Sequence, residues 1–214
     1  TFGDFNNNQV MLDQNKNRIF EFPKSEYTFR TINSIVKSCQ YAKKKFKDIK
    51  FKIIVTDDKS SIETLNKIDS ILKNSEIDSE IIKIKEDEFL DKIEKTDANG
   101  NEISKNMISN MRNNYKSFEI VENENSDLFY ILEDDYIHEK MAITEMLFTY
   151  EKISSQLNKE IFLCPADYPY LYSNIDKTTI YFGNNRHWRQ VNETLNTFLS
   201  SKEMLLKHMN NLKK

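Results

Sequence analysis

Hydrophobic positions recur along the chain with two different spacings, and these spacings predict an alternation of helices and strands. From Tyr27 to Phe46, apolar residues return every three or four positions, which is the spacing of one helical face. The lysine-rich remainder of this helix is interpreted as its solvated side. The next segment, FKIIVTDD, contains an uninterrupted IIV run, which is typical of a strand covered on both faces. We therefore expect a helix followed by a buried strand that ends in two aspartates.

The same alternation continues towards the C-terminus. A short strand, RIFEF, is predicted before Pro23, and later strands are predicted at SEIIKI, DLFYILE and EIFLC. Helical stripes separate them over about 62–72, 107–118 and 139–155. Two capping boxes, which mark helix starts, are expected at Ser60 with Glu63 and at Ser200 with Glu203. The tail adds the segments TTIYFG and TLNTFLS and a last helix.

This order of elements predicts an α/β fold with a Rossmann-like, mostly parallel central sheet flanked by helices. Residues 1–17 are polar and rich in asparagine, and we expect them to form an extension before a single domain over 18–214. Ligands of such sheets bind at the carboxyl ends of the strands. Two predicted strands end there in acidic clusters, at Asp57-Asp58 and at Glu133-Asp134-Asp135.

Composition narrows the classes of function. The 214 residues carry 31 basic and 34 acidic side chains, for a formal charge of −3, so there is no global nucleic-acid footprint. Only three glycines occur, which excludes a P-loop and a GxGxxG fingerprint. No apolar run approaches the roughly 20 residues of a membrane helix. We expect a cytoplasmic protein, and peripheral attachment to the inner face of a membrane stays open. Cys39 and Cys164 are expected to be structural residues.

The acidic triplet is the strongest chemical signal in the sequence. Like charges that follow an apolar strand are suited to a hard divalent cation, which takes carboxylate oxygens and retains water or substrate phosphates as further ligands. The alternative is an exposed loop whose acids are simply solvated. The position of the triplet at a strand end favours the cation site.

Several segments resemble one family in order and spacing. FKIIVTDDKSSIETLNKI is similar to the strand, paired aspartates and helix start of inverting GT-A-fold, family 2-like glycosyltransferases, and YILEDDYIHEKM resembles their D-x-D strand end. The helix NMISNMRNNYKSFEI between them also fits, so that the resemblance covers about residues 18–155. It implies a GT-A-like domain with a nucleotide-binding part over about 18–138 and an acceptor-side part over about 139–214.

The resemblance also implies roles for individual residues. Asp58 would accept a hydrogen bond from the nucleobase, Arg112 would lie near the base or phosphates, and Glu133 would face the ribose or the metal's waters. Asp135 would bind the Mn²⁺ or Mg²⁺ that bridges the diphosphate of a nucleoside diphosphate sugar. The other residues assigned to the nucleotide are Phe22, Pro23, Lys24, Asp57 and Asp134.

Three departures from the family's pattern matter. Glu133 stands where the first aspartate of D-x-D is usual, and Lys59-Ser60 replaces a turn that usually bears glycine. The family's catalytic carboxylate often lies beyond the segment that NTFLSSKEML resembles. The sequence stops at Lys214, about where that carboxylate would be expected. A truncation of the domain at its C-terminal end therefore stays open.

Two later stretches supply further candidates. Asp167 in CPADYPYLY is a candidate general base for the acceptor hydroxyl, and the alternative is an aspartate that only forms a turn. In NNRHWRQ, Arg186 and Arg189 are suited to diphosphate and His187 to a metal, and the alternative is an exposed basic turn with Trp188 packed inward. His138 is interpreted as a loop residue.

The resemblance thus implies an enzyme, a metal-dependent glycosyltransferase that moves a sugar to a carbohydrate or other hydroxyl acceptor with inversion. UDP-sugars are the favoured donors. No nucleic-acid partner is expected. Two other functions remain open. A sugar-phosphate nucleotidyltransferase would use the same acids on a nucleoside triphosphate, although its usual glycine-rich loop is absent. A non-catalytic nucleotide-sugar-binding domain of a larger protein would keep the fold without the transfer.

Overall fold

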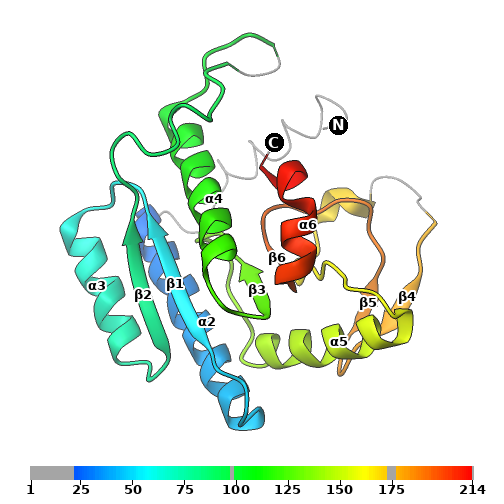
Figure 1. Cartoon of the computed structure of the whole chain (residues 1–214). Helices are drawn as coiled ribbons and strands as arrows, with labels where there is room; N and C mark the ends of the chain where they lie inside the picture. The colour runs from blue at the N-terminus through cyan, green and yellow to red at the C-terminus, as the bar shows by residue number, and fades with distance from the viewer. Residues whose placement is uncertain (1–21, 97–98, 173–176, 214) are drawn as a thin grey trace.

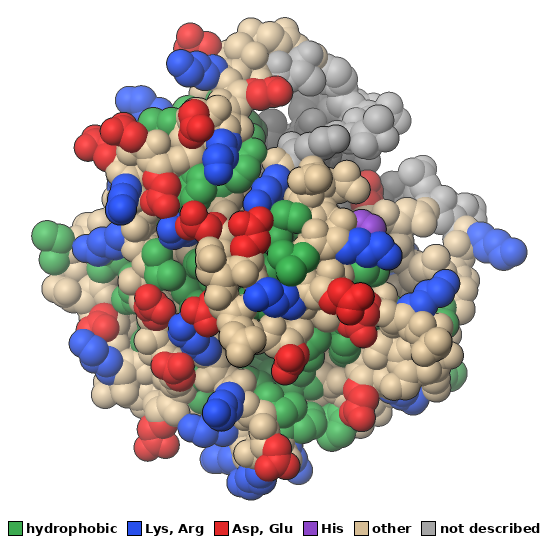
Figure 2. All heavy atoms as spheres, viewed as in Figure 1, with side chains coloured by type: hydrophobic (Ala, Val, Ile, Leu, Met, Phe, Trp, Pro, Cys, Tyr) green, Lys and Arg blue, Asp and Glu red, His purple; other side chains and the backbone are tan. Residues whose placement is uncertain are grey.

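The structure, a computed structural model, describes residues 22–96, 99–172 and 177–213. Within these residues the chain has a mixed α/β fold with five α-helices and six short strands, which pair into three two-stranded sheets (Figure 1). Acidic and basic side chains are interleaved over the face drawn in Figure 2. This face therefore carries no large field of one sign, in keeping with the near balance of charges in the sequence.

The first half of the fold is a parallel strand pair with two helices against it. Helix α2 (Lys24–Lys45) leads into β1 (Lys52–Asp57), and α3 (Ile62–Lys73) connects β1 to β2 (Asp78–Lys83). The two strands pair in parallel, from Lys52 opposite Asp78 to Asp57 opposite Lys83. Apolar residues of α2 and α3 pack against one face of this pair, around Ile32, Ile68 and Leu72.

The second half contains two antiparallel pairs. Helix α4 (Lys105–Asn123) precedes β3 (Leu128–Ile131), and α5 (Ala142–Leu157) follows it. After the short 3₁₀ helix η1 (Pro169–Tyr172) come β4 (Ile180–Phe182), β5 (His187–Arg189), β6 (Phe198–Ser201) and α6 (Lys202–Leu212). Strand β6 pairs antiparallel with β3, and β5 pairs antiparallel with β4.

The hydrophobic core connects these parts. Helices α2 and α5 pack together around Cys39, Met146 and Tyr150, and Leu163 and Leu199 close the same cluster. A separate cluster joins α4 and α6 through Phe118, Val121 and Leu205. Both cysteines are free thiols, and burial raises the pKa of Cys39 to about 12, which makes it an inert core residue.

The α/β class is confirmed, but no extended, mostly parallel central sheet is found in the described residues. Strand β3 is four residues long, and its partner β6 comes from the tail and runs in the opposite direction. The segment expected as the strand EIFLC makes only an isolated antiparallel bridge, between Leu163 and Leu199. The expected first strand RIFEF lies, except for Phe22, outside the described residues.

Both predicted capping boxes are one residue out of register. The N-caps of α3 and α6 are Ser61 and Ser201, whose hydroxyls accept from the backbone N–H groups of Thr64 and Met204 at 3.1 and 3.2 Å. The hydroxyl of the preceding Ser200 is not available for capping, because it donates to the carbonyl of Ile161 at 2.7 Å. In a Ser-Ser pair, tertiary contacts decide which serine caps the helix.

Among the described residues, no helix is both long enough and apolar enough to span a bilayer.

Candidate functional site

The acidic triplet forms a loop, residues 133–135, that directly follows β3 and lies beside the start of α2. Thr28 Oγ1 donates to Asp134 Oδ2 at 2.8 Å across a separation of 106 residues. Lys24 Nζ lies 3.7 Å from Asp134 Oδ1, and both side chains are largely exposed. The structure therefore brings together two residues, Lys24 and Asp134, that the sequence assigned to one nucleotide site.

The N-terminal end of α2 completes this side of the site. Pro23 is the N-cap of α2 and makes no side-chain capping bond. Phe22 is 46% exposed, and the guanidinium of Arg30 lies 4.8 Å from the centre of its ring. The first N–H groups of a helix carry partial positive charge, which favours anions there. The carboxylate of Asp134 lies at this end of the helix, where it contacts the side chains of Lys24 and Thr28.

Glu133 is the least exposed member of the acidic loop. Its burial raises the pKa of its carboxyl, the neighbouring charges of Asp135 and Asp134 raise it further, and Lys24 acts in the opposite direction. A second positive charge at the loop would relieve this repulsion. The electrostatics of the loop therefore fit a cation.

The described residues do not, however, form a complete protein cage for a metal. No group of three or more His, Cys, Asp or Glu side chains converges within the part of the chain that the structure describes. His187, predicted as a ligand together with Asp135, is exposed on β5, and its ring lies 4.6 Å from that of Phe182. An ion at the acidic loop would therefore need most of its ligands from water and substrate oxygens, as Mg²⁺ sites commonly do.

Asp58 and Arg112 meet at the carboxyl end of β1, in the interior of the protein. Arg112 Nη1 donates to Asp58 Oδ1 at 2.7 Å, and the two side chains are 2% and 3% exposed. The remaining nitrogens of the guanidinium donate to backbone carbonyls of Lys85, Glu86 and Glu88. The pair was predicted to contact the nucleotide, and in the structure its first role is to tie α4 and the 85–88 segment to β1.

Asp57 shapes the turn after β1. Its carboxylate accepts from the backbone N–H of Ser60 at 3.3 and 3.4 Å, and the residue is 8% exposed. Lys59 within this turn has a φ of 73°, in the left-handed region that favours glycine. The conformation of the expected glycine turn is therefore kept although the glycine is absent.

Asp167 belongs to a small cluster with Tyr172 and Arg189. Tyr172 donates its hydroxyl to Asp167 Oδ2 at 2.5 Å, and this hydrogen bond raises the pKa of the tyrosine. Arg189 Nη2 lies 3.5 Å from Asp167 Oδ1, within ion-pair distance but without hydrogen-bond geometry, and its guanidinium lies 4.1 Å from the centre of the Tyr172 ring. Two predicted site residues, Asp167 and Arg189, are thus neighbours.

A tyrosine pair joins this cluster to the acidic loop. Tyr136 follows Asp135, Tyr168 follows Asp167, and the two hydroxyl oxygens are 2.9 Å apart. The rings meet edge to face, with centroids 6.5 Å apart, and burial is the main reason that both pKa values are raised. This pairing was not predicted from the sequence. One tyrosine directly after each acidic candidate was the signal in the sequence.

The β4–β5 turn is held by a residue that the sequence analysis missed. Glu145, on the inward side of α5, accepts from the backbone N–H groups of Asn184, Asn185 and Arg186 at 3.1, 2.7 and 3.1 Å. Thr149 and Trp188 donate to the same carboxylate at 3.1 and 3.3 Å. The available signal was a carboxylate on the apolar stripe of a helix, where an ionised group needs buried donors.

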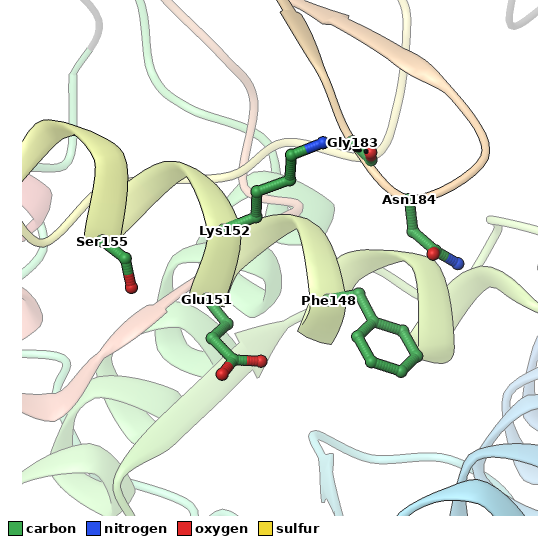
Figure 3. A pocket seen from close by; sticks show the side chains of 6 residues that line it. All are labelled: Phe148, Glu151, Lys152, Ser155, Gly183 and Asn184. Atoms are coloured by element: carbon green, nitrogen blue, oxygen red, sulfur yellow. Dashed lines mark hydrogen bonds between the residues drawn. The ribbon is translucent and has the colours of Figure 1, made fainter.

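The turn sits directly against α5 at Gly183. A Cβ atom there would lie 2.5 Å from Thr149 Oγ1, 2.5 Å from Trp188 Nε1 and 2.6 Å from Glu145 Oε1. Beside this contact, Lys152 reaches from α5 and donates to the carbonyl of Gly183 at 3.2 Å (Figure 3). The junction borders an open hollow of about 410 Å³.

The contacts of Arg186 and His138 indicate structural roles for both residues. Arg186 Nη2 lies 2.7 Å from Glu139 Oε2 in an exposed ion pair, and Trp188 packs against the core below it. The backbone N–H groups of this turn, which could have held a phosphate, are engaged by Glu145. His138 Nε2 lies 2.9 Å from the hydroxyl of Tyr130, and burial lowers the pKa of the imidazole, which suits a neutral loop residue.

No family model, no curated protein and no solved structure matches this chain. The resemblance to glycosyltransferases therefore rests on the sequence motifs, and the function has to be argued from the site.

Proposed function

We propose that the chain is a glycosyltransferase that uses Mn²⁺ or Mg²⁺ and a nucleoside diphosphate sugar, with UDP-sugars favoured, and transfers the sugar with inversion to a hydroxyl acceptor. The observation that carries the proposal is the convergence of two distant segments on the acidic loop. The start of α2 reaches it through Lys24 and Thr28, and the Asp167 segment reaches it through the Tyr136–Tyr168 pair. Donor, cation and acceptor would meet at this loop.

The fold of the proposal is a GT-A-like domain. Figure 1 supports it, because the arrowheads of β1, β2 and β3 point to the same side of the molecule. Asp58 follows β1 and Glu133 lies just beyond β3, so both acidic clusters lie at carboxyl ends of strands, where ligands of α/β proteins bind.

Charge supplies the second argument. When it is bound, the cation would stabilise the negative charge that develops on the departing diphosphate. Asp135 would hold the ion together with phosphate oxygens and water. Lys24, already 3.7 Å from Asp134, would add positive charge beside the diphosphate.

Asp167 is the proposed base. Its carboxylate would take the proton of the acceptor hydroxyl while the acceptor oxygen forms a bond to the anomeric carbon and the bond from that carbon to the diphosphate breaks. Tyr172 and Arg189 position this carboxylate, at 2.5 and 3.5 Å. Direct displacement on the face opposite the leaving group gives inversion. A cytoplasmic location is part of the proposal, and the free thiols of Cys39 and Cys164 are compatible with a reducing compartment.

Thermal melting with nucleotides tests the donor site. A ligand that binds only the native state raises Tm by mass action. We expect a panel of nucleoside diphosphate sugars to raise the Tm of the parent protein when Mn²⁺ is present, and Asp135→Asn to abolish this Mn²⁺-dependent rise. Asp69→Asn, an exposed acid on α3, is the matched control and should behave as the parent does.

The proposal fails if no nucleoside diphosphate sugar raises Tm in the presence of Mn²⁺, or if Asp135→Asn responds as the control does. A rise with nucleoside triphosphates alone would instead favour a nucleotidyltransferase. With a bound donor and an identified acceptor, Asp167→Asn should keep the Tm response yet lower single-turnover transfer by about 100-fold or more. Unchanged transfer in that variant would reject Asp167 as the base.

A further inference from the structure

A second hollow, separate from the acidic loop, runs between α2 and the segment 137–140. Its volume is about 860 Å³. Four cationic side chains line it, from Arg30, Lys37, Lys44 and Lys140, and the described lining residues include no carboxylate. We call this hollow the α2 groove. A one-signed groove is unexpected on a chain whose formal charge is −3, and it points to an anionic ligand.

The three lysines of the α2 groove, Lys37, Lys44 and Lys140, are not neutralised by carboxylates of the described residues. Lys37 and Lys44 are exposed and form no ion pair with any described residue. Arg30 pairs with Glu26 at 3.1 Å, but the nearest acid in sequence to Lys140, Glu139, is engaged by Arg186 at 2.7 Å. At least three lysine charges are therefore available to a ligand.

The spacing of these cations suits a surface rather than a small molecule. Lys37, Tyr41 and Lys44 lie on one side of α2, because they are separated by four and three positions. From Arg30 to Lys44 the helix rises by about 21 Å, at about 1.5 Å per residue. The ring of Tyr41 lies near the groove cation Lys140, whose Nζ is 5.3 Å from its centre, and near Lys45, whose Nζ is 5.9 Å from it.

An exposed aliphatic residue lines the α2 groove, and a second one follows closely in the sequence. Ile137, which also lines the groove, is 68% exposed, and Met141 beyond Lys140 is 42% exposed. Cationic side chains beside exposed apolar ones, with a tyrosine at the same level, are the combination that peripheral proteins present to the headgroup region of a bilayer. A soluble polyanion would satisfy the lysines but would leave Ile137 in water.

We infer that the α2 groove binds the headgroups of anionic phospholipids, with the lysines on the phosphates and Ile137 at the boundary with the acyl chains. This inference does not depend on the proposed transfer reaction. It predicts peripheral attachment, in which each lysine near an anionic surface strengthens binding by about 1 kcal/mol, or roughly fivefold. The attachment should weaken with salt, because the surface potential is screened within about 10 Å at 0.1 M ionic strength.

Vesicle sedimentation with the whole chain tests the inference. The parent should bind vesicles that contain phosphatidylglycerol much more strongly than vesicles of phosphatidylcholine alone, and less strongly at 0.5 M salt. The triple variant Lys37→Gln/Lys44→Gln/Lys140→Gln should bind the anionic vesicles on the order of 100-fold more weakly. The matched control, Lys83→Gln/Lys105→Gln/Lys207→Gln, removes the same charge from exposed positions on other elements and should bind as the parent does.

The variant Ile137→Ser distinguishes binding to a membrane from binding to a soluble polyanion. It should weaken binding to anionic vesicles while it leaves the circular dichroism spectrum and Tm unchanged. Equal binding by the two triple variants, or no preference of the parent for anionic vesicles, would overturn the inference. So would binding of inorganic polyphosphate that requires the three lysines while the vesicles do not bind, because the groove would then hold a soluble polyanion.

Discussion

Arg112 holds Asp58 in a buried ion pair at the end of β1, with Nη1 2.7 Å from Oδ1 and both side chains at most 3% exposed. The same guanidinium donates to three backbone carbonyls of the 85–88 segment. The protein itself therefore engages all three nitrogens of the Arg112 guanidinium. A nucleobase that bonds to Asp58 would reach a carboxylate whose position Arg112 already fixes.

Removal of this arginine should cost stability before it affects any ligand. Arg112→Met keeps much of the side-chain volume but removes the guanidinium donors from the buried carboxylate of Asp58 and from three backbone carbonyls, of which that of Lys85 keeps a second donor, the backbone N–H of Glu88. We expect a loss of about 3 to 5 kcal/mol in the free energy of unfolding, measured by urea denaturation. Lys73→Met breaks the exposed Lys73–Asp69 pair, with its N–O distance of 2.6 Å, and should cost less than about 1 kcal/mol. Similar losses in the two variants would contradict the structural role of Arg112.

Local patterns in the sequence were sufficient to predict most elements. The predicted stripe from Tyr27 to Phe46 became α2, and its apolar residues Phe29, Ile32 and Ile35 are buried. FKIIVTDD became β1, as its run of β-branched residues predicted, but the strand is only partly buried and not fully covered on both faces as expected. These outcomes depend on periodicity, which is a property of a short window of sequence.

Pairings between distant segments were not predictable in the same way. The direction of β6 beside β3 depends on how the tail returns, and no local pattern records that path. The same limit applies to the site. Residue types identified Asp134, Asp167 and Arg189 as candidates, but the contacts of Asp134 with α2 and of Asp167 with Arg189 join segments 106 and 22 residues apart, respectively.

Lys59 offers a test of backbone strain. Its φ of 73° is unfavourable for a residue with a Cβ atom and is ordinary for glycine. A glycine would relieve this strain, which stabilises the folded state, but it would also raise the chain entropy of the unfolded state. Because the relief of strain is the larger effect, we expect Lys59→Gly to raise the free energy of unfolding by about 0.5 to 1 kcal/mol. Lys207→Gly, inside α6, should instead lower it by about 1 kcal/mol. Destabilisation by both substitutions would show that Lys59 makes a contact that outweighs the strain.

Gly183 should tolerate no side chain. An alanine Cβ would lie 2.5 to 2.6 Å from three polar atoms, so that the β4–β5 turn would have to move away from α5. We expect Gly183→Ala to lower the free energy of unfolding by about 1 to 3 kcal/mol, as is usual when a packed site is overfilled. Gly100→Ala is an informative comparison, because a Cβ there meets nothing within 4 Å and only its φ of 81° opposes the change. Thermal denaturation of both variants should therefore show the larger drop for Gly183→Ala.

Glu145 should make the stability of the protein depend on pH in the acid range. Burial by itself raises the pKa of this carboxyl. Hydrogen bonds outweigh burial, so that the pKa is lowered from 4.5; the donors are the backbone of Asn185, Trp188, Thr149 and the backbone of Arg186. A carboxyl whose pKa is lower in the folded state than in the unfolded state stabilises the folded protein, and this contribution is fully present when the pH is above the pKa of the unfolded state. This contribution is lost as pH falls through the folded value. Urea denaturation from pH 7 to pH 3 should therefore show that the parent loses stability below about pH 4.5. The variant Glu145→Gln should lose less stability over the same range.

Glu145→Gln should also be less stable than the parent at pH 7, by about 1.5 to 3 kcal/mol, because hydrogen bonds to a charged acceptor are replaced by bonds to a neutral one. The matched control is Glu151→Gln, an exposed residue on the same helix that should keep both the stability at pH 7 and the acid slope. At pH 3 the parent and Glu145→Gln should approach each other, because the carboxyl of the parent is then largely protonated. A gap between the two that stays constant from pH 7 to pH 3 would mean that packing, and not the charge of Glu145, anchors the β4–β5 turn.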